Sequence, residues 1–502
     1  MGRRRESMSE WDERGAEVEG IDISASVAPA TSAPSDSASL AEESSLAANR
    51  PGVFIKTFGC QMNEYDTQKL YKILEKTYRP VQRLDDASVV IVNTCSVREK
   101  PEQKLFSLLG ELRDYRKDHP QLLIGVGGCV AQQEGARILD RSPAVDFIFG
   151  THNLSVVPAL IEGRLRGLPS QIAVDYREDW EELPLGLTGE GRVSVFVSIS
   201  RGCNKNCTYC IVPTTRGPEV SRPLDEILRE VRIAVHRGGR EVVLLGQTVN
   251  SYGMDFTPRL KFSDLLERVA EVPGLERIRF VSPHPQEIKD DFITLVSQNS
   301  KVCRHVHMPL QSGSDRILKD MNRNYRRKRY MEIINDLRTA VPNIGLSTDI
   351  IVGFPGETEE DFLATMSVLE EVQFDASYSY MFSPRPGTAA ALMKDDVLPE
   401  VKLERLQRLQ RRQDEITTQR LAAWVGKEAE VLLEGPSSAN PLALKGRLSQ
   451  NIVVNLDQHY PRLAPGQIVR VKLTGSARYT LRGEPVEVAL ASALGGPGIG
   501  AA

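Results

Sequence analysis

The sequence predicts a multidomain α/β protein with a small all-β module near its C-terminal end. Three observations predict this class. Apolar strand patterns alternate with amphipathic helix patterns in residues 51–166 and again in residues 191–420, which is typical of parallel sheets covered by helices. In residues 421–487 short strand patterns follow one another. The length of 502 residues also exceeds what one hydrophobic core organises.

Residues 1–50 are predicted to form a disordered tail. They are rich in Ser, Ala, Glu and Pro, and this composition cannot bury enough apolar surface to offset the entropy of ordering. The basic start MGRRRES has no apolar stretch behind it, which excludes a secretory signal, and acidic residues from Glu6 to Glu19 argue against a transit peptide. No run approaches the roughly 18 apolar residues of a membrane span. We therefore expect a cytoplasmic protein with no membrane association. In the reducing cytoplasm, clustered cysteines more often bind metal than form disulfides.

The first folded domain, residues 51–166, contains three predicted strands that each end at a cysteine. The strands are VFIKTFGC, SVVIVNTC and LLIGVGGC, and the helix patterns NEYDTQKLYKILEK, EQKLFSLLGELRDYR and AQQEGARIL follow them in turn. Cys60, Cys95 and Cys129 thus lie just beyond the C-terminal ends of parallel strands, the sheet edge where ligands bind. Three thiols can converge there, although burial as small apolar side chains is the structural alternative.

Residues 167–190 are polar and contain prolines, so we predict a linker. The next domain, residues 191–420, contains six predicted strands: VSVFVSIS, EVVLLGQ, RIRFVS, VHMPLQ, LSTDIIVGFP and ASYSYMFS. Among its helix patterns are LDEILREVRIAVHRG, FSDLLERVAEV and TEEDFLATMSVLEEV. Six such units suit a complete or partial β/α barrel, whose chemistry lies on loops at the C-terminal ends of the strands.

The C-terminal part begins after a charged helix, PEVKLERLQRLQRRQDEITTQRLAAWVG, which we interpret as an amphipathic connector. About five strands then follow in residues 421–487, which predicts a small OB-like barrel of a kind that often binds nucleic acid. The glycine-rich end, residues 488–502, is predicted to be flexible.

The loop after the first barrel strand contains Cys203, Cys207 and Cys210 in the run RGCNKNCTYC. Clustered thiolates favour zinc or an iron–sulfur cluster. A structural zinc site needs four ligands, and the next histidine after this run is His236; a remote fourth ligand is the alternative. A 4Fe–4S cluster held by three thiolates instead leaves one iron open to a small molecule with an amine and a carboxylate. Cys303 has no partner in the sequence and is predicted to be inert core.

The run CNKNCTYC fits CxxxCxxC, and the chain resembles the radical S-adenosylmethionine enzymes in this motif. The resemblance implies that the open iron chelates S-adenosylmethionine and that an electron delivered to the cluster splits the cofactor into a 5′-deoxyadenosyl radical. It also implies adenine contacts from Tyr209 and, in STDIIVGFPGETEEDF, from Ile351 and Gly353. The run MPLQSGSDRIL places Gln311 and Ser312 on the barrel floor. Gln247 is the remaining cofactor-binding candidate, and outside the clusters no catalytic residue is assigned.

The whole architecture, from about residue 51 to residue 486, is similar to the methylthiotransferases within that superfamily. This resemblance implies that Cys60, Cys95 and Cys129 hold a second 4Fe–4S cluster, which takes part in sulfur insertion. It further implies that the C-terminal module is a TRAM domain, an RNA-binding barrel. The expected partners are tRNA, through its anticodon loop, and an electron donor such as flavodoxin or ferredoxin; a monomer is expected.

Three runs resemble family members that convert N6-isopentenyladenosine beside the tRNA anticodon to its 2-methylthio derivative: RGCNKNCTYCIVPTTRGPEVSRP, LLGQTVNSYG and YSYMFSPRPGTAAA. Thr248 stands where asparagine is expected, and Ser282-Pro283-His284-Pro285 replaces a Thr-Ser-His-Pro run, which leaves substrate contacts there open. The alternatives are a methylthiotransferase for threonylcarbamoyladenosine in tRNA and a non-catalytic iron–sulfur RNA-binding redox sensor.

The net charge of −4 means that any RNA contact requires a local basic surface. One candidate is MNRNYRRKRYMEI, with Arg323, Arg326, Arg327, Lys328 and Arg329, although such a run is more often a solvated helix start. The TRAM-like segment offers Lys445, Arg447, Arg470, Lys472, Arg478 and Arg482, which suit phosphate contacts. His305 and His307 alternate on a barrel strand and are expected to pack or hydrogen-bond inside it rather than bind metal.

Overall fold

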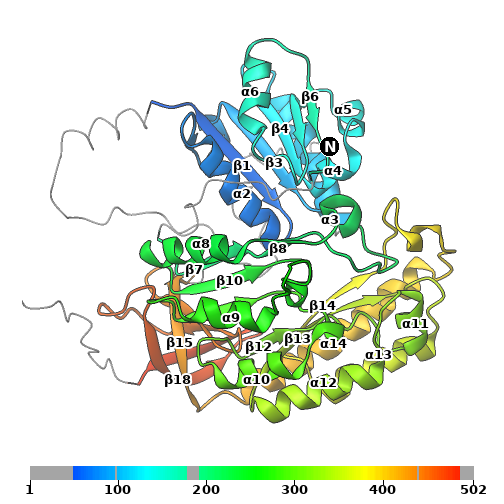
Figure 1. Ribbon diagram of the computed structural model, residues 1–502, viewed down its shortest axis with the longest axis vertical. Coiled ribbons are helices and arrows are strands. Elements are labelled where there is room, and N and C mark those ends of the chain that lie inside the picture. Colours follow the sequence, from blue (N-terminus) through cyan, green and yellow to red (C-terminus); the bar gives the residue numbers. More distant parts are fainter. Residues whose placement is uncertain (1–48, 97–98, 178–190, 438–439, 487–502) are drawn as a thin grey trace, which may run out of the picture.

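The computed structural model describes residues 49–96, 99–177, 191–437 and 440–486. These residues form three bodies, an α/β domain, a β/α wall and a small barrel (Figure 1). Both predicted tails lie outside the described residues, except for residues 49 and 50, and so does the 178–190 part of the predicted linker. In the described ranges, no helix combines the length and apolar character that crossing a membrane requires.

The N-terminal domain is built on a six-stranded, fully parallel sheet with the order β2-β1-β3-β4-β5-β6. The strands are β1 (Gly52–Phe58), β2 (Arg79–Pro80), β3 (Val89–Thr94), β4 (Leu123–Gly128), β5 (Phe147–Phe149) and β6 (Gln171–Ala173). Neighbouring residues of β3 enter different cores, Val89 and Ile91 on one face of the sheet and Val90 and Val92 on the other. A strand buried on both faces requires a continuous apolar run, which is why the sequence pattern predicted it.

Helices cover both faces of this sheet. One face packs against α2 (Gln61–Leu74) and α6 (Val157–Leu165), and the other against α3 (Glu99–Tyr115), α4 (Cys129–Glu134) and α5 (Arg137–Arg141). The prediction of a parallel α/β domain is therefore confirmed.

Two local predictions in this region were wrong. The run AQQEGARIL forms two short helices instead of one, because Gly135 adopts φ +50° and turns the chain out of the helical conformation between α4 and α5. Part of the segment predicted as a linker belongs to the sheet, since β6 pairs with β5 as its edge strand. A three-residue strand has too little apolar pattern to be recognised in a sequence.

The six predicted strands of the central domain are all present, as two parallel three-stranded sheets. They are β7 (Ser194–Ser198), β10 (Glu241–Leu245) and β11 (Arg277–Phe280), then β12 (His305–His307), β13 (Gly345–Val352) and β14 (Ala376–Met381). A parallel bridge from Ile278 to Val302 connects the two sheets between β11 and β12. Among the described strands this wall does not close, so the domain is the partial form of the predicted barrel.

Helices surround the outer side of this wall and enclose the main apolar core with it. They are α8 (Leu224–His236), α9 (Phe262–Ala270), α10 (Asp290–Gln298), α11 (Asp315–Asp320), α12 (Arg327–Ala340), α13 (Glu359–Val372) and α14 (Pro399–Ala422). Single turns of 3₁₀ helix lie at η2 (Leu84–Asp86), η3 (Val249–Ser251), η4 (Pro285–Glu287) and η5 (Ala389–Leu392).

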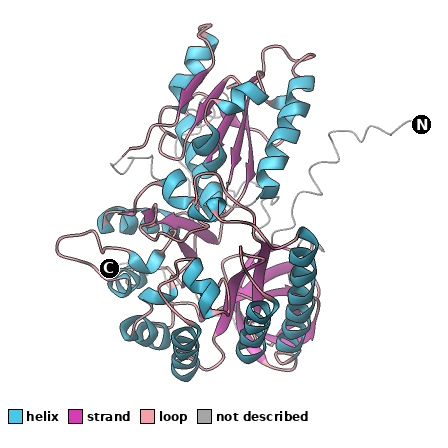
Figure 2. Ribbon diagram, turned by 90° about the vertical axis from the view of Figure 1, so that its right-hand side faces the viewer, coloured by secondary structure: helices cyan, strands magenta, loops and turns pink. Residues whose placement is uncertain are grey.

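The C-terminal module is a closed five-stranded barrel with the order β15-β16-β17-β19-β18, as the sequence predicted. Its strands are β15 (Glu428–Pro436), β16 (Leu444–Leu448), β17 (Val453–Leu456), β18 (Ile468–Ser476) and β19 (Thr480–Pro485). Apolar residues fill its interior, among them Leu433, Val454 and Val471. In both views this barrel and the β/α wall lie together below the N-terminal domain (Figures 1 and 2).

The C-terminal barrel covers the end of the β/α wall where the strands begin. Arg277 and Arg279 of β11 donate hydrogen bonds to the carbonyls of Arg447 at 2.5 Å and Leu448 at 2.7 Å. The Arg304 peptide N–H, just before β12, donates to Ser449 Oγ at 2.8 Å. The end of β16 and the turn that follows it therefore form the floor of the wall, and its opposite end is left for the site.

Candidate functional site

Cys60, Cys95 and Cys129, here called the N-terminal trio, come together at the C-terminal edge of the first sheet. The Cys95 thiol hydrogen-bonds with the thiols of both Cys60 and Cys129. Cys60 immediately precedes α2, and Cys129 is the first residue of α4, so each of these two thiols lies at a helix N-terminus. The convergence predicted from strand order is therefore present, and the alternative of three separate buried side chains is not.

The protein favours the thiolate form at two of these three positions. The pKa of Cys60 is lowered to about 7, first because the Cys95 thiol donates to it and then because the positive charge of Arg216 is close. The same causes lower the pKa of Cys129 to about 6. The pKa of Cys95 is raised because its proton is shared with Cys129 and Cys60. Thiolates are the form that binds metal.

Arg216 brings this charge from the other domain. It ends α7 (Val212–Arg216), six residues after Cys210, and its Nη2 forms a buried ion pair with Asp66 of α2 at 2.7 Å. Next to it, the hydroxyl of Thr151 in the N-terminal domain donates to the carbonyl of Thr215 at 2.6 Å. Sequence reasoning missed Arg216, because no motif spacing relates it to Asp66, which lies 150 positions away.

A second buried ion network fixes the two domains to each other. Lys69 Nζ of α2 lies 2.8 Å from Glu230 Oε1 of α8, and Arg222 binds the other carboxylate oxygen of Glu230. Tyr65, also on α2, donates to the same carboxylate at 3.3 Å. The side chains of Lys69 and Glu230 are 2% and 0% exposed, so the network is fully dry. Because α2 starts directly after Cys60, these contacts fix one end of the N-terminal trio relative to the wall.

Cys203, Cys207 and Cys210, the barrel trio, lie in the loop after β7, as predicted. The two short strands β8 (Ser200–Arg201) and β9 (Val220–Ser221) pair antiparallel and close the base of this loop. Arg323 Nη1 donates to Cys207 Sγ at 3.2 Å, and Cys203 Sγ lies 3.4 Å from Thr248 Oγ1. The expected asparagine is thus replaced by a residue that contacts a cysteine of the trio. Sequence reasoning identified neither contact.

The electrostatics of the barrel trio differ from those of the N-terminal trio. Burial raises the pKa of Cys203, and it raises the pKa of Cys210 to about 12. Neither thiol has a cation close enough to reverse this effect. In the protein alone these thiols therefore keep their protons at neutral pH.

Tyr209 and Ile351, the two side chains expected at the adenine, pack against one apolar cluster formed by Ile317, Met321, Phe354, Phe382 and Ala390. The structure thus brings residues 142 positions apart to one surface beside the barrel trio. An apolar surface next to a polar loop suits a flat heteroaromatic ring.

Gln311 and Ser312 lie in the half of the wall nearest the strand ends, and their predicted place on the floor was wrong. Gln311 pairs with Ile350 late in β13, and the floor is formed by the C-terminal barrel instead. Gln311 has φ +67°, a strained conformation for a non-glycine residue. The Ser312 hydroxyl is fully buried, lies 3.4 Å from Thr365 Oγ1 of α13, and accepts the Ser314 peptide N–H at 3.2 Å.

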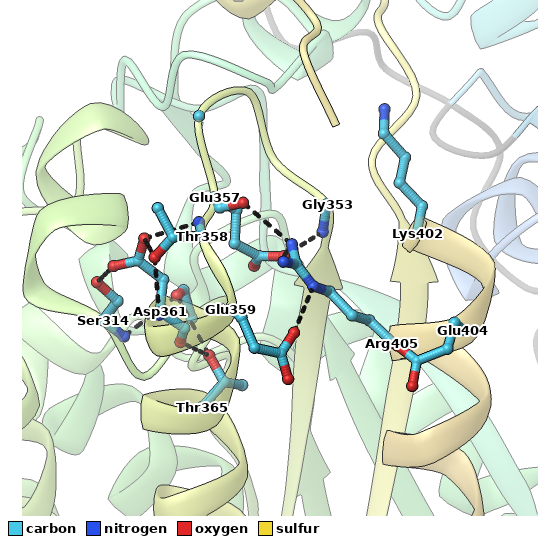
Figure 3. A network of polar contacts seen from close by, with 12 residues as sticks. Ser314, Gly353, Glu357, Thr358, Glu359, Asp361, Thr365, Lys402, Glu404 and Arg405 are labelled. Carbon is cyan, nitrogen blue, oxygen red and sulfur yellow. Dashed lines mark hydrogen bonds and ion pairs between the residues drawn. The ribbon is translucent and has the colours of Figure 1, made fainter. Parts of the chain in front are cut away.

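Gly353 follows β13 in a tightly held loop (Figure 3). Its peptide N–H donates to Glu357 Oε2 at 2.7 Å, and Arg405 of α14 forms an ion pair with the same carboxylate at 2.9 Å. A Cβ at position 353 would lie 2.3 Å from Lys402 Cγ, so α14 leaves room for glycine alone. In this position the glycine shapes the loop, while its N–H is already used within the protein.

The side chains present fit the iron–sulfur clusters and S-adenosylmethionine that such motifs imply. Each trio offers three thiols. In the described part of the chain no three His, Cys, Asp or Glu side chains are arranged to hold a single metal ion. Cysteines that hold a cluster bind different iron atoms and do not need that arrangement. The Gln247 Oε1 atom, at the end of β10, is buried and lacks a hydrogen-bond partner among the described residues, as expected of a group that contacts a bound molecule.

The histidines of β12 hydrogen-bond, as predicted. His305 Nε2 and His307 Nδ1 lie 3.0 and 2.9 Å from Ser347 Oγ, and His307 Nε2 lies 3.0 Å from Asp349 Oδ2. Cys303 is buried at the opposite end of the wall, 3.8 Å from Glu241 Oε2, in agreement with an inert position.

The basic side chains of the C-terminal barrel have different environments. Arg470, Lys472 and Arg482 are exposed and alternate with buried residues along β18 and β19, which suits a phosphate-binding face, and Arg470 also forms an exposed ion pair with Glu428 at 2.8 Å. Arg447 instead forms an ion pair with Glu434 at 3.1 Å, and Arg478 forms one with Asp414 of α14 at 2.8 Å. These two arginines therefore have structural partners.

Comparison with known proteins identifies three regions. Residues 52–150 match an uncharacterized protein family designated UPF0004, residues 197–369 match the radical SAM superfamily, and residues 423–486 match the TRAM domain. The chain is 46% identical over 447 residues to the tRNA-2-methylthio-N(6)-dimethylallyladenosine synthase of Burkholderia ambifaria (strain MC40-6), covering 86% of this chain and 96% of that protein. It is also 46% identical over 449 residues to the protein of the same name from Burkholderia thailandensis, covering 86% and 97%.

Among solved structures, the radical S-adenosylmethionine methyltransferase TsrM from Kitasatospora setae matches with a TM-score of 0.49 and 14% sequence identity. The match covers 68% of this chain and 74% of that chain.

Proposed function

The chain belongs to the radical S-adenosylmethionine methylthiotransferases of the tRNA-2-methylthio-N(6)-dimethylallyladenosine synthase (MiaB) type, and from this premise we propose its substrate and the roles of its residues. The substrate is N6-isopentenyladenosine beside the anticodon of tRNA, and the product is the 2-methylthio derivative. The barrel trio holds the 4Fe–4S cluster that binds S-adenosylmethionine, and the N-terminal trio holds a second 4Fe–4S cluster.

The observation that carries this proposal is a pair of three-thiol sites. They lie on two domains that buried ion pairs hold in a fixed relative position. Asp66 and Arg216 connect the two cysteine loops, and Lys69, Glu230 and Arg222 connect the domains behind them. A reaction that moves a sulfur-containing group onto a carbon needs one site for the sulfur donor and another for activation of the carbon. Two cysteine sites held in a fixed relative position meet that need.

The chemistry of the adenine C2 position explains why iron–sulfur clusters and S-adenosylmethionine are required. The C2–H bond of adenine is neither acidic nor adjacent to a leaving group, so acid–base catalysis has little effect on it. When bound, a 4Fe–4S cluster with S-adenosylmethionine supplies the one-electron chemistry that activates such a bond, and the protein supplies position and shelter from water. The base must leave its stack to reach the space between the trios.

The residues around the barrel trio have assigned roles in this proposal. Tyr209 and Ile351 provide the apolar surface for the adenine of the cofactor. The unpartnered Gln247 Oε1 faces a polar group of the bound molecules. Gln311 shapes the wall beside them, whereas Ser312 and Gly353 support the loops from behind.

The C-terminal barrel contributes RNA affinity in this proposal. Arg470, Lys472 and Arg482 form an exposed basic row on β18 and β19, and phosphate contacts of this type position a nucleic acid without reading its sequence. The electron donor is a flavodoxin or a ferredoxin, and the reaction takes place in the cytoplasm.

Mass spectrometry of tRNA nucleosides from a deletion strain tests the substrate assignment. The 2-methylthio-isopentenyl nucleoside should disappear, its unthiolated precursor should accumulate, and the wild-type chain should restore the modification while Cys203→Ala should not. Loss of a 2-methylthio-threonylcarbamoyl nucleoside instead would identify the other tRNA substrate. An unchanged nucleoside profile would favour the redox sensor.

A further inference from the structure

A strongly basic cleft lies on the outer side of the loop that carries the barrel trio. The cleft has a volume of about 720 Å³, and its lining includes Lys319, Arg323, Arg326, Lys328 and Arg329. Glu332 is the one carboxylate among its lining residues. The chain as a whole carries a net charge of −4, so this concentration of positive charge is a local feature.

One side chain separates the cleft from the barrel trio. Arg323 is buried at the bottom of the cleft, and its Nη1 donates to Cys207 Sγ at 3.2 Å. Hydrogen bonds join the two loops on either side of it: Asn322 Nδ2 donates to the Asn206 carbonyl at 2.7 Å, and Thr208 Oγ1 donates to the Asp320 carbonyl at 2.9 Å. The wall of the cleft is therefore also the outer wall of the cysteine loop.

The positive charges at the rim are available to a partner. Lys319 and Lys328 are exposed and have no carboxylate partner among the described residues. Arg329 pairs at 3.3 Å with Glu332 on the same helix, an exposed contact that contributes little energy. Arg327 behaves differently, because it turns toward α13 and binds Glu371 at 3.1 Å.

We propose that this cleft is the docking site of a small acidic electron-carrier protein that reduces the cluster held by the barrel trio. The proposal rests on the proposed function, which requires one electron per activation: the carrier is oxidised by one electron, and the cluster is reduced by one. A basic rim steers an acidic partner, and the contact between Arg323 and Cys207 places the docked partner one side chain from a cluster ligand.

The position of the cleft favours a carrier over RNA. α12, which flanks it, lies on the side of the molecule away from the N-terminal domain (Figure 1). A target base must instead enter between the two trios, on the side where Arg216 meets Asp66. A carrier in the cleft leaves that entrance open, so reduction and RNA binding can take place on the same enzyme molecule.

The test uses the double variant Lys328→Glu/Arg329→Glu in the full chain. Both residues are exposed, and they occupy the first turn of α12, where glutamate is favourable to the helix. The matched control is Arg268→Glu/Lys289→Glu. It breaks a similar exposed ion pair, Arg268 with Glu271, and reverses the charge of one exposed lysine elsewhere on the outer side. Affinity for an oxidised bacterial flavodoxin is measured by calorimetry at two salt concentrations.

The double variant should bind flavodoxin about tenfold more weakly and with a smaller dependence on salt, whereas the control should match the wild type. Flavodoxin-driven formation of 5′-deoxyadenosine should fall in parallel, while dithionite-driven formation should not change. Unchanged flavodoxin affinity overturns the proposal, and a selective loss of tRNA affinity would identify the cleft as an RNA surface. If the wild type forms no 5′-deoxyadenosine with dithionite, the proposed function fails, but the flavodoxin affinities still decide the docking site.

Discussion

The N-terminal trio and the barrel trio contain the same three ligands but have opposite electrostatics. In the N-terminal trio, the shared proton of Cys95 and the charge of Arg216 lower the pKa of Cys60 to about 7 and of Cys129 to about 6. In the barrel trio, burial raises the pKa of Cys203 and brings that of Cys210 to about 12. The number of cysteines in a site thus does not determine its charge; the residues that the fold places beside them do.

This difference predicts different assembly of the two sites. A thiol must lose its proton to bind iron, so metal binding competes with protons wherever the pKa is high. At the N-terminal trio, the hydrogen bonds from Cys95 and then the charge of Arg216 favour the thiolate form of Cys60 and Cys129 at neutral pH. At the barrel trio the iron itself must displace the protons.

The largest effect is expected from removing one cysteine of each trio. Cys203→Ala should reduce S-adenosylmethionine cleavage by roughly a thousandfold or more, because the cofactor loses its iron site. Cys129→Ala should leave cleavage measurable and abolish methylthiolation of tRNA. Both products are quantified by mass spectrometry after anaerobic reconstitution, with Cys303→Ala as the control. Loss of cleavage in Cys129→Ala would show that the two sites are not independent.

A smaller effect is expected when the buried ion network between the two domains is weakened. Glu230→Gln leaves Lys69 and Arg222 buried without a full negative charge, which should lower the free energy of unfolding by about 4 kcal/mol. Urea unfolding of the metal-free protein measures this change. Glu226→Gln, which removes a more exposed partner of Arg222, should cost less than about 1 kcal/mol. Equal losses in the two variants would contradict a special role for the dry network.

The link between the trios themselves can be broken at Arg216. Arg216→Gln leaves Asp66 buried and unpaired, and it should lower the free energy of unfolding by about 3 kcal/mol. It should also move the pKa of Cys60 part of the way back toward its ordinary value, because the hydrogen bond from Cys95 remains. Arg216→Lys keeps the charge and should retain more of both properties. If Arg216→Gln leaves the alkylation profile of Cys60 unchanged, the cation does not act on the trio.

The smallest expected effect is a difference between Cys60 and Cys210 in the pH dependence of their alkylation. A lowered pKa means that the Cys60 thiolate is present above about pH 7 and is lost below it. At pH 7.5 the exposed Cys60 of the metal-free protein should therefore react with iodoacetamide about 8 times faster than a thiol of ordinary pKa. Cys210 should stay unreactive through pH 9. Peptide mass spectrometry after timed quenching measures both rates. Similar pH profiles of alkylation for the two residues would show that the two trios do not differ in electrostatics.

Sequence patterns predicted the parts of the fold that depend on local regularity. Strand–helix alternation placed the N-terminal trio at strand ends and the barrel trio in the loop after a strand, since parallel strands must end at one edge, and the structure agrees for both trios. It could not reveal Arg216 or Arg323, whose contacts with Asp66 and Cys207 form only when segments more than a hundred residues apart are docked. β6 was missed for a different reason, because three residues carry no period that can be recognised.

The turn that covers the lower end of the β/α wall has a consequence for the order of events. With Arg277, Arg279 and Arg304 bound to residues 447–449, the lower end of the wall is covered, so we expect both the cofactor and the RNA to approach from the strand-end side. A cofactor bound at the barrel trio then lies beneath an RNA that binds from the same side. S-adenosylmethionine should therefore be loaded before the nucleic acid arrives, and the modified RNA should depart before the spent cofactor, a compulsory sequence that product-inhibition patterns would display.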